Sequence, residues 1–425
     1  MMPIEQQAYI IFRYYKYGEE TDARMQKAIK ITERIYWIGG NDRETDLFEG
    51  LWSLPCGVAY NAYLINDEKA AVIDTIKSAN LADYIERLTS ILPQGKQLDY
   101  LIVDHMEPDH SGSIRMMRQL YPDMKIVGNK KTAEMLDAFY GIKDGIIEVK
   151  EGDVLDLGHH KLTFAMIPMV HWPESMVTFD TTEKVLFSTD AFGGFSALEG
   201  GIFDDELDMN HYEAETLRYF ANIVGRYSAP TQKAIAKVRA IAPSVICPAH
   251  GPILRSNPNH IIDLYDKWSR HETEEGIVVV YGSMYGNTKF MTDAIARAAC
   301  EEGIQNVIVH DASRSNMSFM VRDIWKYRGL VLGSCTYNTE LYPPVAHLCR
   351  TLSNKMMKNR VLGICGSYSW SKGALAELQV FAERGGEWTL VDPSVEVKSS
   401  PSEADLEQCR LLGRNVARAV KNFNA

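Results

Sequence analysis

Short apolar runs separated by polar segments dominate the first 270 residues, and they predict buried β-strands. The clearest runs cover residues 98–103, 162–170, 185–189 and 245–249. Their length and residue types are those of strands in a covered sheet. The first run is followed by Ile114, Met117 and Leu120, which recur at helical spacing. This half of the chain is therefore predicted to combine strands with helices that cover them.

A different pattern begins near residue 274. Apolar runs cover residues 277–281, 329–333 and 361–365. Each run ends in a loop of small, hydroxyl-bearing and aromatic residues. The first loop leads into a helix with Met291, Ile295 and Ala298 on one face. Strands that alternate with helices in this way predict a doubly wound parallel sheet, and we place a domain boundary near residue 274.

Potential metal ligands gather where the strands of the first half end. Residues 104–112 read Asp-His-Met-Glu-Pro-Asp-His-Ser-Gly, which packs four such side chains into six residues. Pro108 is expected to keep a helix from forming across them, because it fixes its own φ and lacks an N–H. The full predicted set is His105, Glu107, Asp109, His110, His171, Asp190 and His250. Seven such groups suffice for two metal ions, with Asp190 as the natural bridge.

Glu107 changes the chemistry that is expected. Together with Asp109 and Asp190 it makes the site anionic and rich in hard oxygen ligands. Carboxylates suit iron or manganese better than thiolates do, and imidazole is compatible with iron. A redox iron pair is therefore the first interpretation. A hydrolytic zinc site remains the alternative for this half. The simplest alternative to any metal site is a polar loop in which Asp109 caps the start of a helix.

The loop after residue 281 is suited to a phosphate. It leads directly into a helix N-terminus, where backbone N–H groups and the helix dipole favour an anion. It lacks the Gly-Lys-Ser/Thr of a nucleotide-hydrolysing loop and is not Gly-x-Gly-x-x-Gly, so a cofactor that is held and not cleaved is expected. Loops at neighbouring strand ends could then grip a flat ring.

The predicted cofactor cradle combines three strand-end loops. It comprises Ser283, Met284, Tyr285, Gly286, Asn287, Thr288, Ser334, Thr336, Tyr337, Asn338, Gly366, Ser367, Tyr368, Ser369 and Trp370. Tyr337 and Trp370 are the aromatic residues expected beside the ring. The alternative for each is an ordinary surface aromatic residue at a strand end.

The order of the seven ligands resembles the metallo-β-lactamase superfamily, an αββα sandwich, although hydrolytic members carry histidine where this chain has Glu107. The Ser-x-Tyr-Gly-Asn-Thr loop resembles flavodoxin, which binds FMN. Over roughly residues 28–420 the chain resembles one family, the flavodiiron proteins or A-type flavoproteins. The resemblance implies an α/β and α+β protein with an N-terminal extension (1–27), a metallo-β-lactamase-like diiron domain (28–273) and a flavodoxin-like FMN-binding domain (274–425).

The resemblance also implies a function. Family members reduce dioxygen to water, nitric oxide to nitrous oxide, or both. By analogy, His105, Glu107 and His171 would bind one iron, and Asp109, His110 and His250 the other, with Asp190 bridging. FMN stores two electrons and the iron pair two more, which together are the four that dioxygen needs. We expect an oxygen reductase with no catalytic side chain beyond the ligands. A nitric oxide reductase is the alternative, ahead of a zinc hydrolase fused to a flavodoxin and of a gas sensor.

The composition indicates which cellular compartment to expect. No apolar run approaches the ~20 residues of a membrane-spanning helix. The first residues lack the continuous apolar core and cleavage site of a signal peptide. The seven cysteines contain no Cys-x-x-Cys pair, which favours a reducing, cytoplasmic location and excludes an appended rubredoxin.

Charge suggests a partner. Residues from Gly276 onward carry 17 basic and 14 acidic side chains, or +3, while the rest of the chain carries −14. Nothing suggests a nucleic-acid surface, which needs a basic field. An acidic electron donor, a rubredoxin or similar carrier, is expected at the positive half. Candidate docking residues are Arg322, Lys326, Arg328, Lys355, Lys358 and Arg360. The resemblance further implies a head-to-tail homodimer or a dimer of dimers.

Overall fold

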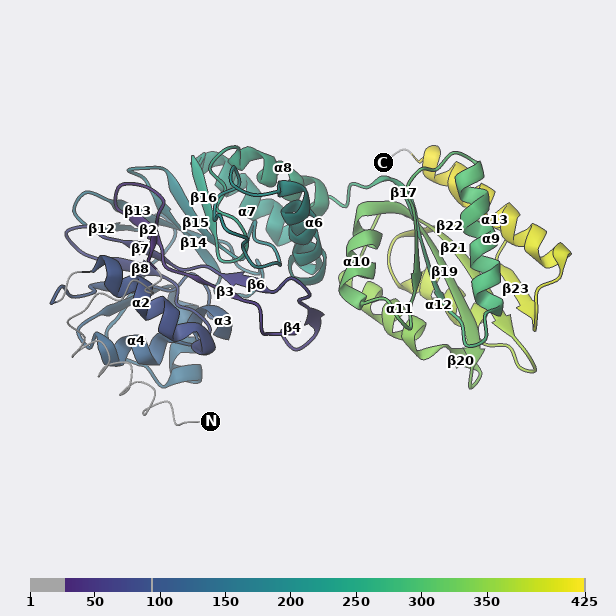
Figure 1. The fold of residues 1–425 in the computed structure, drawn as a ribbon, viewed down its shortest axis with the longest axis horizontal. Helices are drawn as coiled ribbons and strands as arrows, with labels where there is room; N and C mark the ends of the chain where they lie inside the picture. The colour runs from purple at the N-terminus through teal and green to yellow at the C-terminus, as the bar shows by residue number, and fades with distance from the viewer. Residues whose placement is uncertain (1–26, 93–94, 424–425) are drawn as a thin grey trace. The chain divides into compact units, whose positions relative to one another are not determined.

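The computed structural model describes residues 27–92 and 95–423, which form two compact units (Figure 1). The first unit comprises the chain up to Phe48, Leu54–Thr216 and Ala229–Ile262, and the second comprises Glu49–Ser53, Leu217–Ser228 and the chain from Asp263 onward. The predicted extension at 1–27 lies almost wholly outside the described residues. The predicted domain ranges 28–273 and 274–425 stay predictions, because compact units do not fix where a domain begins.

Two β-sheets form the first unit. The seven-stranded sheet has the order β1 (Ile29–Lys30), β2 (Ile35–Trp37), β7 (Tyr63–Ile65), β8 (Ala71–Ile73), β9 (Tyr100–Ile102), β10 (Lys125–Gly128) and β11 (Ile146–Glu148). The five-stranded sheet has the order β12 (Val154–Asp156), β13 (Lys161–Met166), β14 (Met176–Asp180), β15 (Val185–Thr189) and β16 (Val245–Pro248). The remaining short strands of this unit are β3 (Gly40–Asp42), β4 (Leu47–Phe48) and β6 (Val58–Tyr60), whereas β5 (Trp52–Ser53) lies in a segment of the second unit.

Helices lie outside these sheets. They are η1 (Ser78–Asn80), α2 (Leu81–Ile91), α3 (Pro108–Ser111), α4 (Ile114–Leu120), α5 (Lys130–Met135), η2 (Leu136–Tyr140), α6 (Met209–Tyr219), α7 (Ser228–Ile241) and α8 (Pro258–Ser269). Two further short helices, η3 (Phe220–Val224) and η4 (Gly225–Tyr227), lie in a segment of the second unit. Figure 1 shows α2 and α4 beside the seven-stranded sheet. Lys237 of α7 donates to the Met166 carbonyl at the end of β13, so α7 belongs to the five-stranded side.

Apolar side chains from both sheets meet in one core. Tyr63 and Ile102 come from the seven-stranded sheet, and Phe164 and Phe187 from the five-stranded one, and all four are buried. The rings of Tyr63 and Phe187 lie 5.3 Å apart, which places the two sheets face to face. The predicted αββα sandwich is confirmed.

The second unit contains one main sheet. Its strands are β17 (Glu274–Gly282), β18 (Val307–Asp311), β19 (Tyr327–Tyr337), β20 (Glu340–Leu341), β21 (Arg360–Tyr368), β22 (Trp388–Leu390) and β23 (Val395–Lys398). Its helices are α9 (Asn287–Glu301), α10 (Met317–Lys326), α11 (Pro343–Lys355), α12 (Ala374–Arg384) and α13 (Glu403–Lys421). Within the described residues no helix has both the length and the apolar character needed to cross a bilayer.

The strand order in this sheet is β18-β17-β19-β21-β22, and all these neighbours are parallel. The chain therefore changes direction across the sheet at β17: β18 is added on one side of β17, and β19 and the later strands are added on the other. Helices α9 and α13 cover one face, and α10 and α11 the other (Figure 1). This confirms the predicted flavodoxin-like doubly wound sheet, whose ligands bind beyond the carboxyl ends of the strands at such a switch point.

Candidate functional site

Each predicted metal ligand stands at or beyond the end of a buried strand. His105 and Glu107 follow β9, Asp190 follows β15, and His250 follows β16, while His171 lies between β13 and β14. Apolar strand residues fix the backbone by packing, and the polar side chains begin where the strands leave the core. This arrangement holds functional groups on a rigid frame.

The prediction that Pro108 keeps a helix away from the ligands is wrong. Pro108 begins the short helix α3, which carries Asp109 and His110. The missing N–H of proline costs nothing at the first helical position, where that group has no intrahelical partner. The helix turns both side chains back toward the strand ends.

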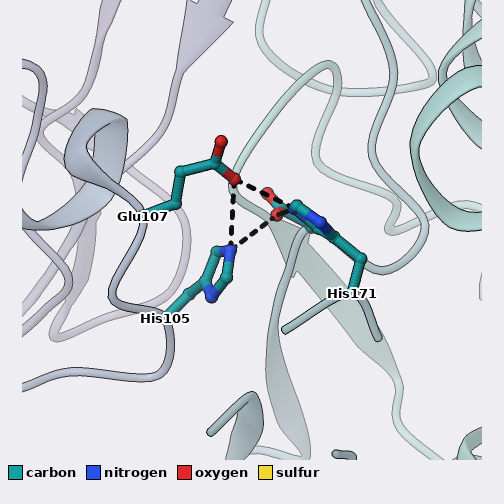
Figure 2. Close-up of side chains that lie close together, drawn as sticks. His105, Glu107 and His171 are labelled. Atoms are coloured by element: carbon teal, nitrogen blue, oxygen red, sulfur yellow. Dashed lines mark hydrogen bonds and ion pairs between the residues drawn. The ribbon is translucent and has the colours of Figure 1, made fainter. Parts of the chain in front are cut away.

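Three side chains, His105, Glu107 and His171, gather around one oxygen of Asp190. Its Oδ2 lies 3.2 Å from Nε2 of His105 and 3.0 Å from Nε2 of His171. Glu107 Oε2 lies 3.4 Å and 3.0 Å from the same two nitrogens. Figure 2 shows these imidazoles and the Glu107 carboxylate pointing toward one another.

A second group surrounds the other oxygen of the same carboxylate. Asp190 Oδ1 lies 3.0 Å from Nε2 of His110 and 3.2 Å from Nε2 of His250. The two oxygens of Asp109 lie 3.4 Å and 3.3 Å from these nitrogens. Asp190 therefore lies between two groups of ligand atoms and presents one oxygen to each.

Apart from the contact between His105 and Glu107, which has hydrogen-bond geometry, these close contacts are not hydrogen bonds. Nε2 of His110, Nε2 of His171 and both oxygens of Asp109 and Asp190 are buried and have no partner in hydrogen-bond geometry. Unpaired buried polar atoms are costly and rare. Two ligands that are each about 2.1 Å from one ion, at right angles, lie about 3.0 Å apart. The spacing and the unpaired atoms together fit two metal ions with Asp190 between them.

Electrostatics agree with this interpretation. Burial opposes protonation of the imidazoles, but Asp190 and Glu107 outweigh it and raise the pKa of His171 to about 9. Asp109 and Asp190 similarly raise the pKa of His250 to about 10 against its burial. Burial also opposes ionisation of Asp190, yet the surrounding imidazoles hold the pKa of its carboxyl well below its ordinary value. The cluster thus has excess negative charge that attracts cations, either protons or metal ions.

Further partners orient the ligands, and sequence reasoning missed the most important one. Glu174 is buried, and its Oε1 accepts from Nδ1 of His105 at 2.8 Å and from the Met106 N–H at 2.9 Å. Nδ1 of His250 donates to the Ala59 carbonyl at 2.8 Å. Metal-bound imidazoles commonly donate their second N–H in this way. Glu174 stands three residues after His171 in the same loop, which was its only sequence signal.

Aromatic rings enclose the cluster. Phe48 and Tyr60 contact the His250 ring with centroids 5.4 and 5.6 Å away, and Trp172 lies 5.3 Å from the His105 ring. Phe48 thus reaches a ligand, whereas the neighbouring Glu49 accepts a hydrogen bond from the Trp52 indole. These rings place apolar surface beside the ligands.

A pocket lies at the predicted cofactor cradle. Nine of the predicted residues line it: Ser283, Met284, Tyr285, Asn287, Thr288, Thr336, Ser367, Tyr368 and Ser369. Cys335 and Ser399 complete the lining and were not predicted. Ser399 follows β23, which pairs with β21, and its N–H donates to the Tyr368 carbonyl at 2.6 Å. Only that strand pairing, which the sequence does not reveal, brings it to the pocket.

The other predicted cradle residues lie around the pocket without lining it. They are Gly286, Ser334, Tyr337, Asn338, Gly366 and Trp370. Ser334 is buried, and its hydroxyl donates to the Cys335 carbonyl and accepts from the Tyr342 N–H. Trp370 is 93% exposed and Tyr337 is 42% exposed. Both aromatic side chains are therefore accessible to a ring or to another protein.

The N-terminus of α9 opens onto this pocket without a side-chain cap. Gly286 occupies the cap position with φ 96° and no side-chain cap, so the first N–H groups of this 15-residue helix stay available. The Gly286 N–H itself donates to the Ser283 hydroxyl at 3.0 Å. Thr288, in the first turn of α9, and Ser367, near the end of β21, share a hydrogen bond of 2.9 Å. Uncapped helical N–H groups at a pocket fit the phosphate of FMN.

The predicted donor-docking residues do not form an exposed face. Arg360 is fully buried and donates to the Ile324 and Trp325 carbonyls at the end of α10. Its role is to satisfy carbonyls that have no partner within the helix. Arg328 donates to the Val420 carbonyl, and Arg322 pairs with Asp323. Of the six, Lys358 is exposed. Counting charges along the chain cannot separate solvated cations from those that pair with backbone carbonyls.

Two family comparisons match the two halves of the chain. Residues 58–251 match the ODP family beta lactamase, and residues 279–413 match the flavodoxin family. The first match contains all seven predicted metal ligands, and the second contains every predicted cradle residue.

Several known proteins resemble nearly the whole chain. The anaerobic nitric oxide reductase flavorubredoxin of Escherichia coli O1:K1 is 31% identical over 92% of this chain and 82% of its own length. The structure of rubredoxin oxygen:oxidoreductase from Desulfovibrio gigas is 30% identical, covers 93% of this chain and 99% of its own, and has a TM-score of 0.89. The flavodiiron protein from Giardia intestinalis is 26% identical, with coverages of 94% and 98% and a TM-score of 0.90.

Proposed function

Because this chain belongs to the flavodiiron protein family, we propose that it reduces dioxygen to water at a non-haem diiron centre, with electrons relayed through FMN from an external donor. The observation that carries the proposal is the pair of ligand groups on either side of Asp190, whose two buried carboxylate oxygens each approach two imidazoles without hydrogen-bond geometry.

His105, Glu107 and His171 would hold one iron, and Asp109, His110 and His250 the other, with Asp190 bridging. The family's cofactors are FMN and two iron ions, and when bound they would supply the stored electrons and a Lewis-acid template for the gas. Glu174 would keep His105 oriented with its Nε2 toward Asp190. The aromatic rings of Phe48, Tyr60 and Trp172 would limit the access of water to the ligands.

The FMN phosphate would bind at the α9 N-terminus, near the hydroxyls of Ser283 and Thr288. The loops after β19 and β21 would hold the ring. No lysine stands in the first loop, so backbone N–H groups and neutral hydroxyls bind the phosphate. This arrangement retains a cofactor and does not activate a phosphate for transfer.

Dioxygen is the first choice of substrate, and nitric oxide is the second candidate. Relatives of both kinds resemble the chain at similar identity, one named for nitric oxide reduction and one for oxygen reduction. Both gases are small and apolar, so the seven ligands do not discriminate between them. A zinc hydrolase is disfavoured because Glu107 adds a third carboxylate to the centre.

We further propose a rubredoxin-like external donor, a cytoplasmic location and a head-to-tail homodimer or dimer of dimers. In such a dimer the FMN of one chain would serve the irons of its partner. The donor proposal rests on the relative named as a rubredoxin oxygen:oxidoreductase. All seven cysteines are free, which agrees with the reducing compartment expected from the sequence.

Gas consumption tests the proposed activity. The iron-loaded, FMN-bound protein would be reduced without oxygen by a reduced rubredoxin, and dioxygen and nitric oxide uptake would be compared by electrode. Fast dioxygen loss without peroxide, together with slow nitric oxide loss, is expected. The reverse preference makes the protein a nitric oxide reductase. Uptake of neither gas contradicts the proposal.

A further inference from the structure

A second cluster of potential ligands lies at the opposite end of the five-stranded sheet from Asp190. His160 immediately precedes β13, Asp180 ends β14, and Glu183 lies in the turn between β14 and β15. Asp180 pairs with Val185 at the beginning of β15, whereas Asp190 follows the end of that strand. At a rise of about 3.3 Å per residue, the two ends of β15 are about 15 Å apart. The cluster is therefore separate from the proposed diiron centre.

The three side chains converge. One potential ligand atom from each lies within 4.8 Å of the others. His160 Nδ1 is 3.1 Å from Asp180 Oδ2. His160 and Asp180 are both 0% exposed, and Glu183 is half-buried. This burial distinguishes the cluster from the solvated acidic groups that are common on protein surfaces.

The His160 ring lacks hydrogen-bond partners. Both of its nitrogens are buried, and neither has a partner in hydrogen-bond geometry. The Nδ1 contact with Asp180 is close but misaligned, as are the contacts around Asp190. A buried imidazole without partners is costly, and an ion between the three side chains would satisfy it.

Surrounding hydrogen bonds hold the cluster in place. The His160 N–H donates to Asp67 Oδ2 at 2.7 Å, and Arg34 holds the other oxygen of Asp67 at 2.8 Å. Asp180 accepts the Thr182 and Glu183 N–H groups at 3.2 and 2.9 Å. The Asp67 and Arg34 partners belong to the segment that carries the seven-stranded sheet, so the cluster joins the two sheets.

We propose that His160, Asp180 and Glu183 form a structural site for a divalent metal ion of the zinc type. One imidazole and two carboxylates are donors that zinc accepts, with water completing a tetrahedral shell. The ion would balance the negative charge of Asp180 and Glu183. Its role is to fasten the β12–β13 and β14–β15 turns together at the open end of the sandwich.

Zinc binding to the iron-loaded, FMN-bound protein tests this site. After removal of loosely bound metal, the wild type is expected to take up one zinc per chain with no loss of iron. Anomalous diffraction at the zinc edge should then show a peak beside His160. Zinc that enters only in exchange for iron overturns the proposal, since it has entered the diiron centre.

Matched variants complete the test. H160Q and E183Q are expected to lose the additional zinc, whereas H159Q keeps it, because His159 is the exposed neighbour of His160. Added zinc should raise the thermal midpoint of the wild type and of H159Q but not of H160Q. If His160 is simply a charged partner of Asp180, H160Q loses stability while zinc has no effect on any form. That result, or full zinc uptake by H160Q, overturns the site.

Discussion

A single carboxylate organises the proposed centre. Asp190 is fully buried and offers one oxygen to His105 and His171 and the other to His110 and His250. Its position directly after a strand end leaves it little freedom to move. At the residue scale the sequence predicted which side chains the fold brings together, because four of them stand in one dense run and the other three follow apolar runs.

Glu174 provides a residue-scale prediction. It accepts the second N–H of His105, so Glu174→Ala should weaken one iron site by about 10- to 100-fold. Glu174→Gln keeps an acceptor oxygen but loses the charge, and its effect should lie between wild type and alanine. Iron retention against a competing chelator measures the iron affinity of the wild type and the two variants, and so tests this ranking.

The matched control for this series is Glu134→Gln, which changes an exposed carboxylate on α5. It should retain iron like the wild type. Equal iron affinity in the wild type and the alanine variant would show that Glu174 does not support His105. The sequence could not single out Glu174, because only the folded loop brings it behind a ligand that lies 69 residues away along the chain.

At the scale of elements, periodicity identified the sheets and helices but not their exact ends. The run at 162–170 predicted a longer strand than β13, which ends at Met166. Pro108 was interpreted as a helix breaker although it begins α3. Both errors have one cause, which is that residues at element ends take the conformation that tertiary packing requires and not the one that local preference suggests.

The loop before α9 gives an element-scale prediction. Gly286 has φ 96°, and a Cβ there would meet no atom nearer than 3.9 Å, so conformation and not space excludes a side chain. Gly286→Ala should cost about 1–2 kcal/mol in this left-handed conformation. The loop can relax when FMN is absent, so the cost should appear as roughly tenfold weaker FMN binding. Fluorescence titration of the apoprotein measures it.

Gly303→Ala is the control for this variant. Gly303 follows the other end of α9 with φ 90°, so the substitution imposes a similar backbone cost away from the pocket. It should lower the thermal midpoint without changing FMN affinity. An unchanged FMN affinity in Gly286→Ala would remove the loop from the proposed phosphate site.

The connection after α8 should make the second unit sensitive to acid. Burial, followed by the positive charges of Arg360 and Lys358, lowers the pKa of His271 to about 4. Below the ordinary histidine pKa of about 6.5, His271 binds a proton in the unfolded chain but not in the folded chain. Stability therefore falls as pH drops from about 6.5 to 4, by at most about 1.4 kcal/mol per pH unit.

The variant His271→Leu removes this titration. Its thermal midpoint should fall less than that of the wild type between pH 7 and pH 5, while His347→Leu, which changes an exposed histidine, keeps the wild-type slope. Parallel pH profiles for the wild type and His271→Leu would contradict the assignment.

At the scale of the whole molecule, the sequence predicted two units with the correct folds, because each half carries its own pattern of strands and motif. It could not predict that two short segments from the first half of the chain, Glu49–Ser53 and Leu217–Ser228, belong to the second unit. Nor could it exclude Arg360 from a docking surface, since burial depends on how α10 meets β21.

The proposed head-to-tail dimer makes a complementation prediction. Asp190→Asn should lack the iron pair, and Ser283→Asp should lack FMN, because its added charge repels the phosphate. Each variant alone should be inactive. Co-expressed chains should recover part of the dioxygen uptake, because FMN on one chain would serve irons on the other. Absence of any recovery in confirmed mixed dimers would contradict electron transfer between chains.

The central claim is that electrons leave FMN through irons held by the seven ligands. Its most direct test is rapid mixing of dioxygen with the anaerobically reduced wild type and with Glu107→Ala, following flavin oxidation and peroxide. The wild type should oxidise its flavin quickly and form no peroxide, whereas Glu107→Ala should keep FMN, lose one iron per chain, oxidise slowly and release peroxide. Fast, peroxide-free oxidation in Glu107→Ala would contradict the account.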